Sequence, residues 1–550
     1  MAGKVHPARY DAIVIGAGHN GLVAASILAS HGLRVAVFEA RDHVGGLASS
    51  PQLWPGFRVP IGAYVVSLFK RRLAARLGLL GKIRIYPKDP SMTVILEDGK
   101  HVRVWSDAEK TAREFSRFSA KDARSYPEWE RYWSGVARLL DILYENPPLD
   151  PLELADTVRK ASSVPLLGSR ARRVASELEW LFTAPALRVL DEYFEAEESK
   201  TALLEDAIVG ELASPSSPGT ALVLAHHYMG DITGRRGQWA YVEGGMGRIS
   251  EVLLDSCLGK GVDLYLGHSV DEIAVEGERV IGVVSRGKLY PSRVVVSTVN
   301  VKRVFLGMLE DPGVVDKGLL RRVKALTSIG ASAKLVIARR GLPRLRSGYS
   351  GLGEDPYRSS LLVMKSTGYV ESAYASALGR GVSEAPWISV NTQSFLDPTI
   401  APEGYHVVSI FAQYVDSRKR RWGPEDEEEV SARIRMVAEE VFESLYGDKY
   451  RELVVTPRYI EENYGNPGGN IFHLNMTPDQ VYHKRPLREL SSYRTPLKGL
   501  YISGASTHPG GGVTGLPGEL AAQAVLEDLG IVEKRKTKLL ELVKNVLKSM

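Results

Sequence analysis

The chain has 550 residues, a formal net charge of +5 at pH 7 and a hydrophobic content of 44%. This length allows about three to four domain-sized units, and the composition is typical of a soluble globular protein. The small net charge gives no sign of a nucleic-acid surface, so we expect no nucleic-acid partner. The one cysteine, Cys257, excludes an intrachain disulfide, a dithiol redox centre and a cysteine-cluster metal site.

The sequence also limits contacts with membranes and metals. The first nine residues are polar and predict no signal peptide. No apolar run approaches the ~20 residues that a membrane-spanning helix needs. No HExxH pattern or similarly tight histidine–acid spacing is present, so we expect no metal site. We therefore expect a cytoplasmic protein whose contact with a membrane, if it has one, is peripheral.

Residues 10–49 carry the strongest local signal. An apolar, β-branched run over 12–15 predicts a buried parallel strand. The run Gly16-Ala17-Gly18-His19-Asn20-Gly21 follows directly, and a helical pattern of small and apolar residues comes next. A second strand pattern over 35–38 ends at Glu39. This order predicts a dinucleotide-binding unit, and the alternative is a tight turn with no ligand.

Each glycine of the turn has its own expected role. Gly16 lets the chain turn out of the strand, Gly18 lets the backbone approach a pyrophosphate, and Gly21 lets the helix pack close to the sheet. The helix N-terminus then presents free N–H groups to the phosphates. Glu39, 23 residues after Gly16, can accept hydrogen bonds from a ribose diol.

The residues after Glu39 bear on which dinucleotide is bound. The segment 41–49 has the spacing RxxxGGxxxS, beginning at Arg41 and containing Gly45 and Gly46. This spacing resembles the second glycine motif of the FAD-binding amine oxidase and phytoene desaturase superfamily. The resemblance implies FAD rather than NAD, and the alternative is a surface turn.

The segment 51–67 continues this resemblance. Its pairs Gly56-Phe57 and Gly62-Ala63 are similar to the segment that passes the flavin face, where small residues let the backbone touch a planar ring. Pro60 stands where the family often has an acid, so we expect no carboxylate role at that point.

The middle of the chain is mixed, then helical. Strand patterns over 93–96 and 101–105 flank a turn over 97–100, which predicts a hairpin. From 107 to 212 the apolar spacing becomes that of helices, interrupted at prolines. We interpret this part as a helical insertion, which either caps a sheet or forms a lid over an apolar substrate.

Residues 214–305 lead back towards the nucleotide unit. A helix is predicted from 249 to about 258, and strands follow over 262–266, 269–275, 279–285 and 293–298. In the superfamily this block returns to the FAD domain, which implies that the backbone at Val270 flanks the adenine. His226 and His227 are candidates for proton transfer, and a buried, hydrogen-bonded pair without chemistry is the favoured alternative.

Residues 306–490 predict a second unit. Strand patterns cover 334–339, 387–391 and 406–413, and a long helix is predicted over 425–445. The loop 463–485 is dense in glycine, asparagine and histidine, as loops that carry sites often are. Its His473 either contacts substrate or caps the loop. The catalytic residues stay unknown, with His226 and His473 as weak candidates.

The stretch 497–528 is the second strong signal. A strand over 499–503 runs into Gly504, and three glycines lead to a helix that begins near Thr514 or Gly515. A helix N-terminus aimed at the flavin would stabilise the negative charge of its reduced form by about 0.3–1 kcal/mol, and by up to ~2 when buried. Many FAD enzymes place an acid after this first glycine, where this chain has Ala505.

The tail, residues 533–550, has the pattern of a basic amphipathic helix. It is expected to dock on its own domain, on a second copy of the chain in a homo-oligomer, or on an anionic membrane surface as a peripheral contact.

Several motifs together resemble the phytoene desaturase-related FAD oxidoreductases, nearest to the branch called pyridine nucleotide-disulfide oxidoreductase domain-containing protein 2. The resemblance extends over about residues 10–529 and is looser in the helical middle. Since the chain has one cysteine, the disulfide part of that name cannot apply here. The motifs are GAGHNGLVAA at 16–25, GxWxYVxGGMG at 237–247, GGNIFH at 468–473 and GASTHPGGGVTGLPG at 504–518.

The resemblance implies an α/β fold in which a Rossmann-like FAD-binding domain is interleaved with a mixed-sheet substrate domain and a helical insertion. We predict FAD-binding parts at 10–70, 241–305 and 491–530, substrate-domain parts at 71–240 and 306–490, and the tail helix at 531–550. The predicted FAD contacts are Gly16, Ala17, Gly18, Asn20, Gly21, Glu39, Ala40, Arg41, Gly45, Gly46, Leu47, Gly62, Ala63, Val270, Gly504, Ala505, Val513 and Thr514.

Three functions are consistent with these motifs. The first is hydride transfer between flavin N5 and a small apolar, isoprenoid- or carotenoid-like substrate, which would desaturate or saturate a C–C bond; amine oxidation is a less favoured reaction of the same class. The second is a flavoprotein with a mainly binding or regulatory role, because no acid–base constellation stands out. The third is a peripheral membrane enzyme that draws its substrate from the bilayer.

Overall fold

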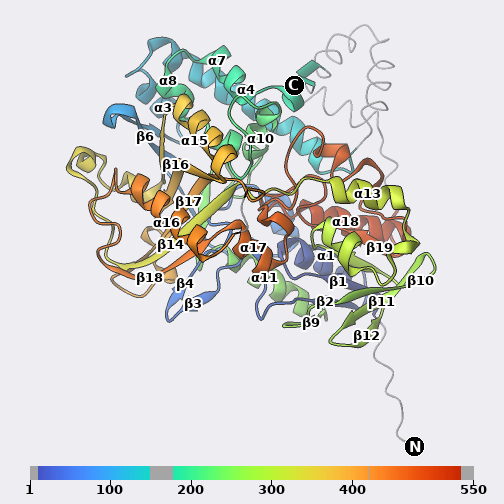
Figure 1. Cartoon of the computed structure of the whole chain (residues 1–550). Helices are drawn as coiled ribbons and strands as arrows, with labels where there is room; N and C mark the ends of the chain where they lie inside the picture. The colour runs from blue at the N-terminus through green and yellow to red at the C-terminus, as the bar shows by residue number, and fades with distance from the viewer. Residues whose placement is uncertain (1–9, 149–175, 178, 420–421, 534–550) are drawn as a thin grey trace, which may run out of the picture.

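The computed structural model describes residues 10–148, 176–177, 179–419 and 422–533. The chain forms two lobes, one around a parallel sheet and one around a mixed sheet, with a layer of helices along one side (Figure 1). Within the described residues, no helix is both long and apolar enough to cross a membrane. Residues 534–550, which make up nearly all of the predicted tail helix, lie outside the described residues.

The first lobe is built on a five-stranded parallel sheet in the order β19-β13-β1-β2-β9. The apolar run after Asp11 forms β1, whose residues are all buried, because helices and strands cover both faces of the sheet. The register pairs Ile13 with Val295 on one side and with Ala36 on the other. The strands are β1 (Ala12–Ile15), β2 (Val35–Phe38), β9 (Asp263–Tyr265), β13 (Val295–Ser297) and β19 (Leu500–Ile502).

Three helices cover one face of this sheet: α1 (His19–Ser30), α11 (Gly247–Leu258) and α18 (Leu516–Asp528). They share one apolar core with β1, β2 and β13. Small residues keep the packing close, since a Cβ at Gly518 would lie 2.2 Å from the Asn20 carbonyl oxygen. The thiol of Cys257 is buried in this core and donates to the Leu22 carbonyl at 3.3 Å, so the cysteine is structural here.

The opposite face of the parallel sheet packs against a three-stranded antiparallel sheet. This sheet consists of β10 (Glu272–Glu276), β11 (Arg279–Ser285) and β12 (Lys288–Pro291). Phe38 at the end of β2 stacks on Tyr265 with ring centroids 4.6 Å apart, and Tyr290 meets the same ring edge-on. These aromatic contacts join the two sheets beside the carboxyl end of β2.

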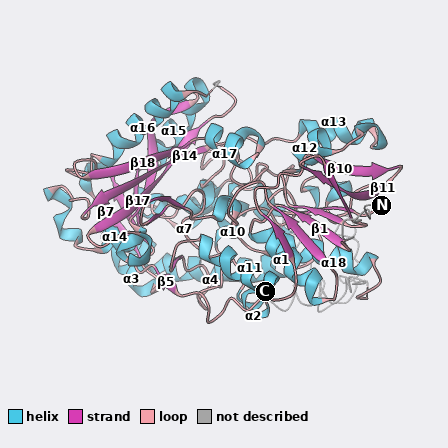
Figure 2. Cartoon of the chain, turned by 90° about the horizontal axis from the view of Figure 1, so that it is seen from below, coloured by secondary structure: helices cyan, strands magenta, loops and turns pink. Residues whose placement is uncertain are grey.

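The second lobe is built on a seven-stranded sheet in the order β18-β14-β17-β16-β15-β6-β7. β15 and β6 run parallel and the other neighbouring pairs run antiparallel. Both lobes are seen from another side in Figure 2. The strands are β6 (Met92–Leu96), β7 (His101–Val104), β14 (Ser332–Arg340), β15 (Ser360–Lys365), β16 (Val382–Asn391), β17 (Tyr405–Val415) and β18 (Lys449–Val455).

Alternation along β14 assigns its side chains to two different environments. Leu335 and Ile337 pack against α16 (Pro424–Ala438) on one face. Val336 and Ala338 pack on the other face, where Phe57 and its neighbours cover the sheet. Lys334 lies in register with this second set.

The predicted helical insertion is a set of helices that share one large core with the end of the mixed sheet. Trp129 and Trp133 of α4 are fully buried in that core, together with Trp387 of β16. Pro165, one of the prolines expected to interrupt the helical pattern, lies outside the described residues. The helices of this layer are α3 (Ala108–Phe115), α4 (Ala120–Tyr144), α7 (Ala186–Tyr193), α8 (Glu197–Thr201), α9 (Glu205–Ile208) and α10 (Thr220–His227).

The helix predicted over 425–445 is shorter in the structure, because α16 ends at Ala438. Beyond that point the backbone pairs with another segment, since Arg346 N–H donates to the Val441 carbonyl and Glu443 N–H donates to the Arg344 carbonyl. Tertiary hydrogen bonds therefore replace the last helical turns, although Val441 stays in the core with the same apolar spacing.

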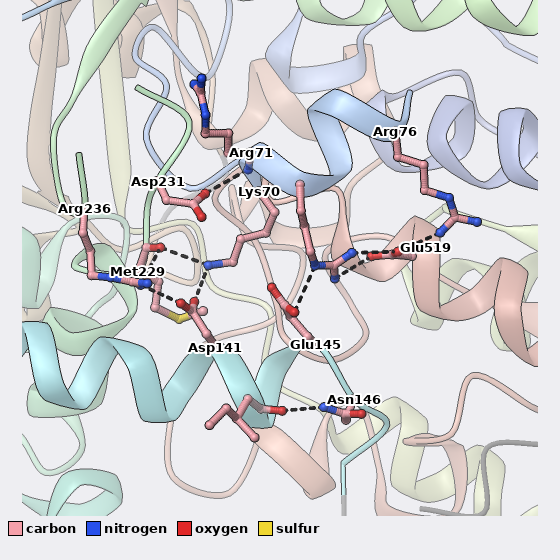
Figure 3. A network of polar contacts seen from close by, with 12 residues as sticks. Lys70, Arg71, Arg76, Asp141, Glu145, Asn146, Met229, Asp231, Arg236 and Glu519 are labelled. Atoms are coloured by element: carbon pink, nitrogen blue, oxygen red, sulfur yellow. Dashed lines mark hydrogen bonds and ion pairs between the residues drawn. The ribbon is translucent and has the colours of Figure 1, made fainter. Parts of the chain in front are cut away.

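A polar network joins the helical layer to the first lobe (Figure 3). The Lys70 side chain, only 1% exposed, precedes α2 (Arg71–Arg76) and pairs with Asp141 of α4. Its Nζ also donates to the Met229 carbonyl at 3.0 Å, and Arg236 pairs with the same carboxylate at 2.6 Å. A buried ammonium needs these partners, because its desolvation would otherwise be costly.

We predict that Asp141→Ala destabilises the protein by about 3–5 kcal/mol, because it leaves the buried Lys70 ammonium without its carboxylate. The measurement is the midpoint of denaturant unfolding. Asp191→Ala is the control, since Asp191 pairs with Lys200 while 53% exposed, and its loss should cost no more than about 1 kcal/mol. Equal midpoints for the two variants would contradict the prediction.

Candidate active site

A cavity of about 470 Å³ lies between the two lobes. Its walls come from the turns after β1, β2, β13 and β19, from the segment before α2, and from β14, β15 and β17 of the mixed sheet. The carboxyl ends of parallel strands are where ligands bind in open α/β sheets. The cavity continues from this edge into a chamber next to the helical layer.

The turn after β1 has the shape that a pyrophosphate site requires. Gly16 has φ +97°, and a Cβ at Gly21 would lie 1.9 Å from the Gly16 carbonyl oxygen, so both glycines are needed by the fold itself. Gly18 differs, because its φ of −65° suits any residue and no atom lies within 4 Å of the place of a Cβ. That free space faces the cavity, so the absent side chain leaves room for a ligand and not for the protein.

The N-terminus of α1 points to the same space. Gly18 is its N-cap and offers no side-chain hydrogen bond, so the first N–H groups of the helix stay available to an anion. The residues present therefore fit a pyrophosphate group at this turn.

Glu39 lies where the ribose contact is expected, at the end of β2. Its Oε2 accepts the Ala17 N–H at 2.8 Å and its Oε1 accepts the Arg41 N–H at 3.0 Å. These two bonds fix the carboxylate at the cavity wall. The Arg41 guanidinium donates to the Asn463 carbonyl at 2.6 Å and lies 4.6 Å from the centroid of the Tyr464 ring, which closes this side of the cavity.

Backbone hydrogen bonds connect the segment of the second glycine pair to the turn after β1 and to the segment near Gly62. Gly45 N–H donates to the Ala17 carbonyl at 2.9 Å, with φ +113°. Gly62 and Ala63 both donate their N–H groups to the Leu47 carbonyl, at 3.0 and 2.9 Å. A Cβ at Gly62 would lie 2.5 Å from that same oxygen, so the close approach requires glycine.

Thr298, just after β13, leaves no room for a Cβ at two glycines. A Cβ at Gly16 would lie 2.5 Å from its Oγ1, and a Cβ at Gly504 would lie 2.5 Å from its carbonyl oxygen. The turns that follow β1, β13 and β19 therefore meet at one point of the cavity wall. Ala505 and Val513 line the cavity beyond this point, and α18 begins at Leu516, two residues later than Thr514.

All the predicted FAD contacts line the cavity except Ala17, Gly21 and Thr514. Gly21 serves helix packing, as described above. Thr514 is buried, and its Oγ1 accepts the Leu516 N–H at 3.2 Å, so its side chain caps α18. Val270 lines the cavity beside Glu39, in the segment just before β10. Contact with FAD at the lining positions stays a prediction.

The three predicted histidines differ in position. His473 lines the cavity, its Nδ1 lies 3.1 Å from Ser506 Oγ, and burial lowers its pKa to about 3. His227 also lines the cavity, and its Nδ1–H donates to the Asp206 carbonyl at 2.7 Å. Burial lowers the pKa of His227 to about 4, although the hydrogen bond to the Asp206 carbonyl acts to raise it. Both rings are therefore neutral near pH 7.

His226 does not line the cavity. Its ring is fully buried, and among the described residues neither nitrogen has a hydrogen-bond partner. A Cβ at Gly512 would lie 3.1 Å from its Nε2, so the ring lies behind the glycine loop. Burial holds its pKa well below the usual value. Of the two catalytic candidates, only His473 borders the cavity.

Six charged residues of the cavity lining were missed in the sequence: Lys88, Glu205, Asp206, Arg303, Lys334 and Glu462. Lys334 of β14 donates from Nζ to the Pro60 carbonyl at 2.8 Å and the Gly62 carbonyl at 3.0 Å. Burial holds its pKa well below the usual value. The sequence did contain a signal for Lys334. It is a lone lysine inside an apolar strand, and the alternation of side chains along β14 points it away from α16.

We predict that Gly18→Ala weakens FAD binding about ten-fold or more and leaves the thermal stability of the FAD-free protein unchanged. The added methyl enters space that only a ligand uses, and overpacking of this kind costs about 1–3 kcal/mol. Binding is measured by titration with FAD after its removal. Gly379→Ala is the control, because Gly379 is exposed on α15 (Thr367–Arg380) and equally free of neighbours. Unchanged FAD affinity in Gly18→Ala would contradict this assignment.

Comparison with known proteins agrees with this geometry. Residues 21–526 match the family described as flavin containing amine oxidoreductase. The chain is 34% identical to rat pyridine nucleotide-disulfide oxidoreductase domain-containing protein 2, over 94% of each chain. It is 25% identical to one of the limonene dehydrogenase subunits of Castellaniella defragrans, over 95% of each chain.

Among solved structures, a putrescine oxidase variant superposes with a TM-score of 0.60 at 16% identity, covering 95% of this chain and 98% of that one. This likeness confirms the predicted fold class. The family match confirms the predicted superfamily and its cofactor, FAD. The chain is thus an FAD-containing oxidoreductase that belongs to the flavin-containing amine oxidoreductase family.

Proposed function

We propose that this protein transfers a hydride between flavin N5 and a carbon atom of a small, largely apolar, isoprenoid-like substrate, while a proton leaves or joins the neighbouring carbon, and so desaturates or saturates a C–C bond. The observation that carries the proposal is one continuous cavity that runs from the dinucleotide loops into a chamber with mostly apolar walls. The similarity to a protein named as part of a limonene dehydrogenase supports a hydrocarbon-like substrate.

The bound flavin supplies the hydride chemistry when present, so the protein's tasks are binding, orientation and exclusion of water. Gly62 and Ala63 would present their backbone to the ring, held in place by the Leu47 carbonyl. Lys334, on β14 of the other lobe, donates hydrogen bonds to the Pro60 and Gly62 carbonyls and so holds this backbone in position. The Tyr64 ring lies 4.7 Å from the Lys334 ammonium and borders the chamber. This arrangement would hold the flavin and the substrate in one geometry.

Amine oxidation is the second candidate, because Glu205 and Asp206 border the chamber and could attract an ammonium group. Lys88 lies in the same wall and opposes that attraction. Hydride transfer involving a largely apolar molecule is therefore the function that we favour.

The test of the proposed function is the visible spectrum of the purified protein during anaerobic titration. We expect the flavin bands to bleach with an isoprenoid hydrocarbon or, in the reductive direction, to bleach with NADPH and recover when an unsaturated isoprenoid is added. Bleaching by amines alone would favour amine oxidation. Flavin that no compound reduces would favour a binding role.

We also predict that Lys334→Met slows flavin reduction about ten-fold or more while FAD stays bound. The substitution removes the donor shared by the carbonyls of residues 60–62, so the backbone that faces the ring shifts. Stopped-flow absorbance gives the rate constant of flavin reduction. Lys365→Met is the matched control, since Lys365 lies on the same sheet but pairs at the surface with Glu440. Equal rate constants for wild type and Lys334→Met would contradict the prediction.

A further inference from the structure

The apolar chamber contains one compact polar group, formed by Lys88, Glu205 and Asp206. We call these three residues the chamber triad. All three line the cavity. Lys88 directly follows β5 (Ile85–Pro87), and the two acids begin α9. None of them takes part in the dinucleotide loops or in the contacts of Lys334, so the proposed function leaves them without a role.

Lys88 is held in a fixed position. Its Nζ donates to Ser360 Oγ at 2.6 Å, and Ser360 in turn donates to Asn391 Oδ1 at 2.9 Å. The Tyr241 ring lies 5.8 Å from the ammonium. Lys88 is only 3% exposed, and what it exposes faces the cavity. One of its three N–H donors is therefore used by Ser360, and others remain for a ligand.

Glu205 and Asp206 line the same cavity, and neither has a cationic partner in direct contact among the described residues. In the described part of the chain, neither Glu205 nor Asp206 forms an ion pair within 4.0 Å. Burial and the Asp206 carboxylate raise the pKa of Glu205 to about 7, with Lys88 opposing the shift. Burial raises the pKa of Asp206 to about 7, again opposed by Lys88. Burial also lowers the pKa of Lys88 to about 8.

The chamber triad therefore combines groups of opposite charge, and burial disfavours the charged form of each of them. A hydrocarbon in contact with it would remove water from three polar groups and satisfy none of them. A charged end group would be desolvated with little net attraction to offset that cost. A hydroxyl can accept from the ammonium and donate to a carboxylate at the same time.

The rest of the chamber is suited to an apolar molecular body. Aliphatic and aromatic side chains from both lobes and from the helical layer line the same cavity as the triad: Leu68, Met92, Val209, Trp239, Phe411 and Ile471.

We propose that Lys88, Glu205 and Asp206 form a binding subsite for a hydroxyl group at the end of an otherwise apolar substrate, so that the substrate is an alcohol rather than a pure hydrocarbon. This inference deepens the proposed function and rests on it for the location of the reacting carbon in the same chamber. The hydroxyl is a recognition group, and no bond to its oxygen is made or broken.

The test compares four ten-carbon ligands that share one carbon skeleton: geraniol, its parent hydrocarbon, geranylamine and geranate. Isothermal titration calorimetry of the FAD-loaded protein, without oxygen, gives each dissociation constant. We expect geraniol to bind at least ten-fold more tightly than each of the other three. Equal or tighter binding of the hydrocarbon, the amine or the carboxylate would overturn the proposal.

Substitutions in the chamber triad complete the test. Lys88→Met and Asp206→Asn should each reduce the preference for geraniol over the hydrocarbon about ten-fold, and Asp206→Asn serves if Lys88→Met fails to fold. The control is Glu198→Gln, which alters another lysine–glutamate pair, with Lys100, outside the cavity wall. A preference unchanged in the triad variants would overturn the subsite.

Calorimetry and the flavin spectrum together distinguish the two proposals. If geraniol binds tightly and no ligand ever bleaches the flavin, the subsite stands and the proposed reaction fails. If the hydrocarbon bleaches the flavin and geraniol binds no better, the reaction stands and the subsite fails.

Discussion

The structure depends on the close approach of three strand ends around Thr298. Its hydroxyl and its carbonyl leave no room for a Cβ at Gly16 or at Gly504, which follow β1 and β19. Because these turns are so tight, the N-terminus of α1, the Glu39 carboxylate and the loop before α18 all border one cavity. A side chain at either glycine would push the strand ends apart, and all three of these groups would move from their positions at the cavity.

The second lobe contributes what a dinucleotide fold lacks. Lys334 reaches from the mixed sheet to the carbonyls of residues 60–62, so the two lobes meet at the backbone that is expected to face the flavin. The buried pair of Lys70 and Asp141 attaches the helical layer to the same region. In both contacts a lysine is taken out of water and satisfied by fixed acceptors, which makes the relative position of the parts specific.

The cavity thus combines two kinds of surface. Its dinucleotide end is mostly backbone N–H groups and glycine, which suits phosphates and a planar ring. Its chamber end is mostly apolar, apart from the triad of Lys88, Glu205 and Asp206. In the proposed function the chamber selects the substrate, because the reaction type belongs to the cofactor.

The sequence by itself determined the dinucleotide turn, the acid at the end of β2 and most of the strands, because these follow from local spacing and from residue types with few alternatives. The choice of FAD came from the resemblance of its motifs to a known superfamily. Contacts between distant segments decided the rest. Residues 439–445 keep an apolar pattern, yet they leave the helix to pair with residues 344–346. His226 and His227 are neighbours in the chain, but only His227 borders the cavity. Lys88, Glu205 and Lys334 meet one space from three distant segments, and no local pattern encodes that meeting, since it arises only when the lobes pack.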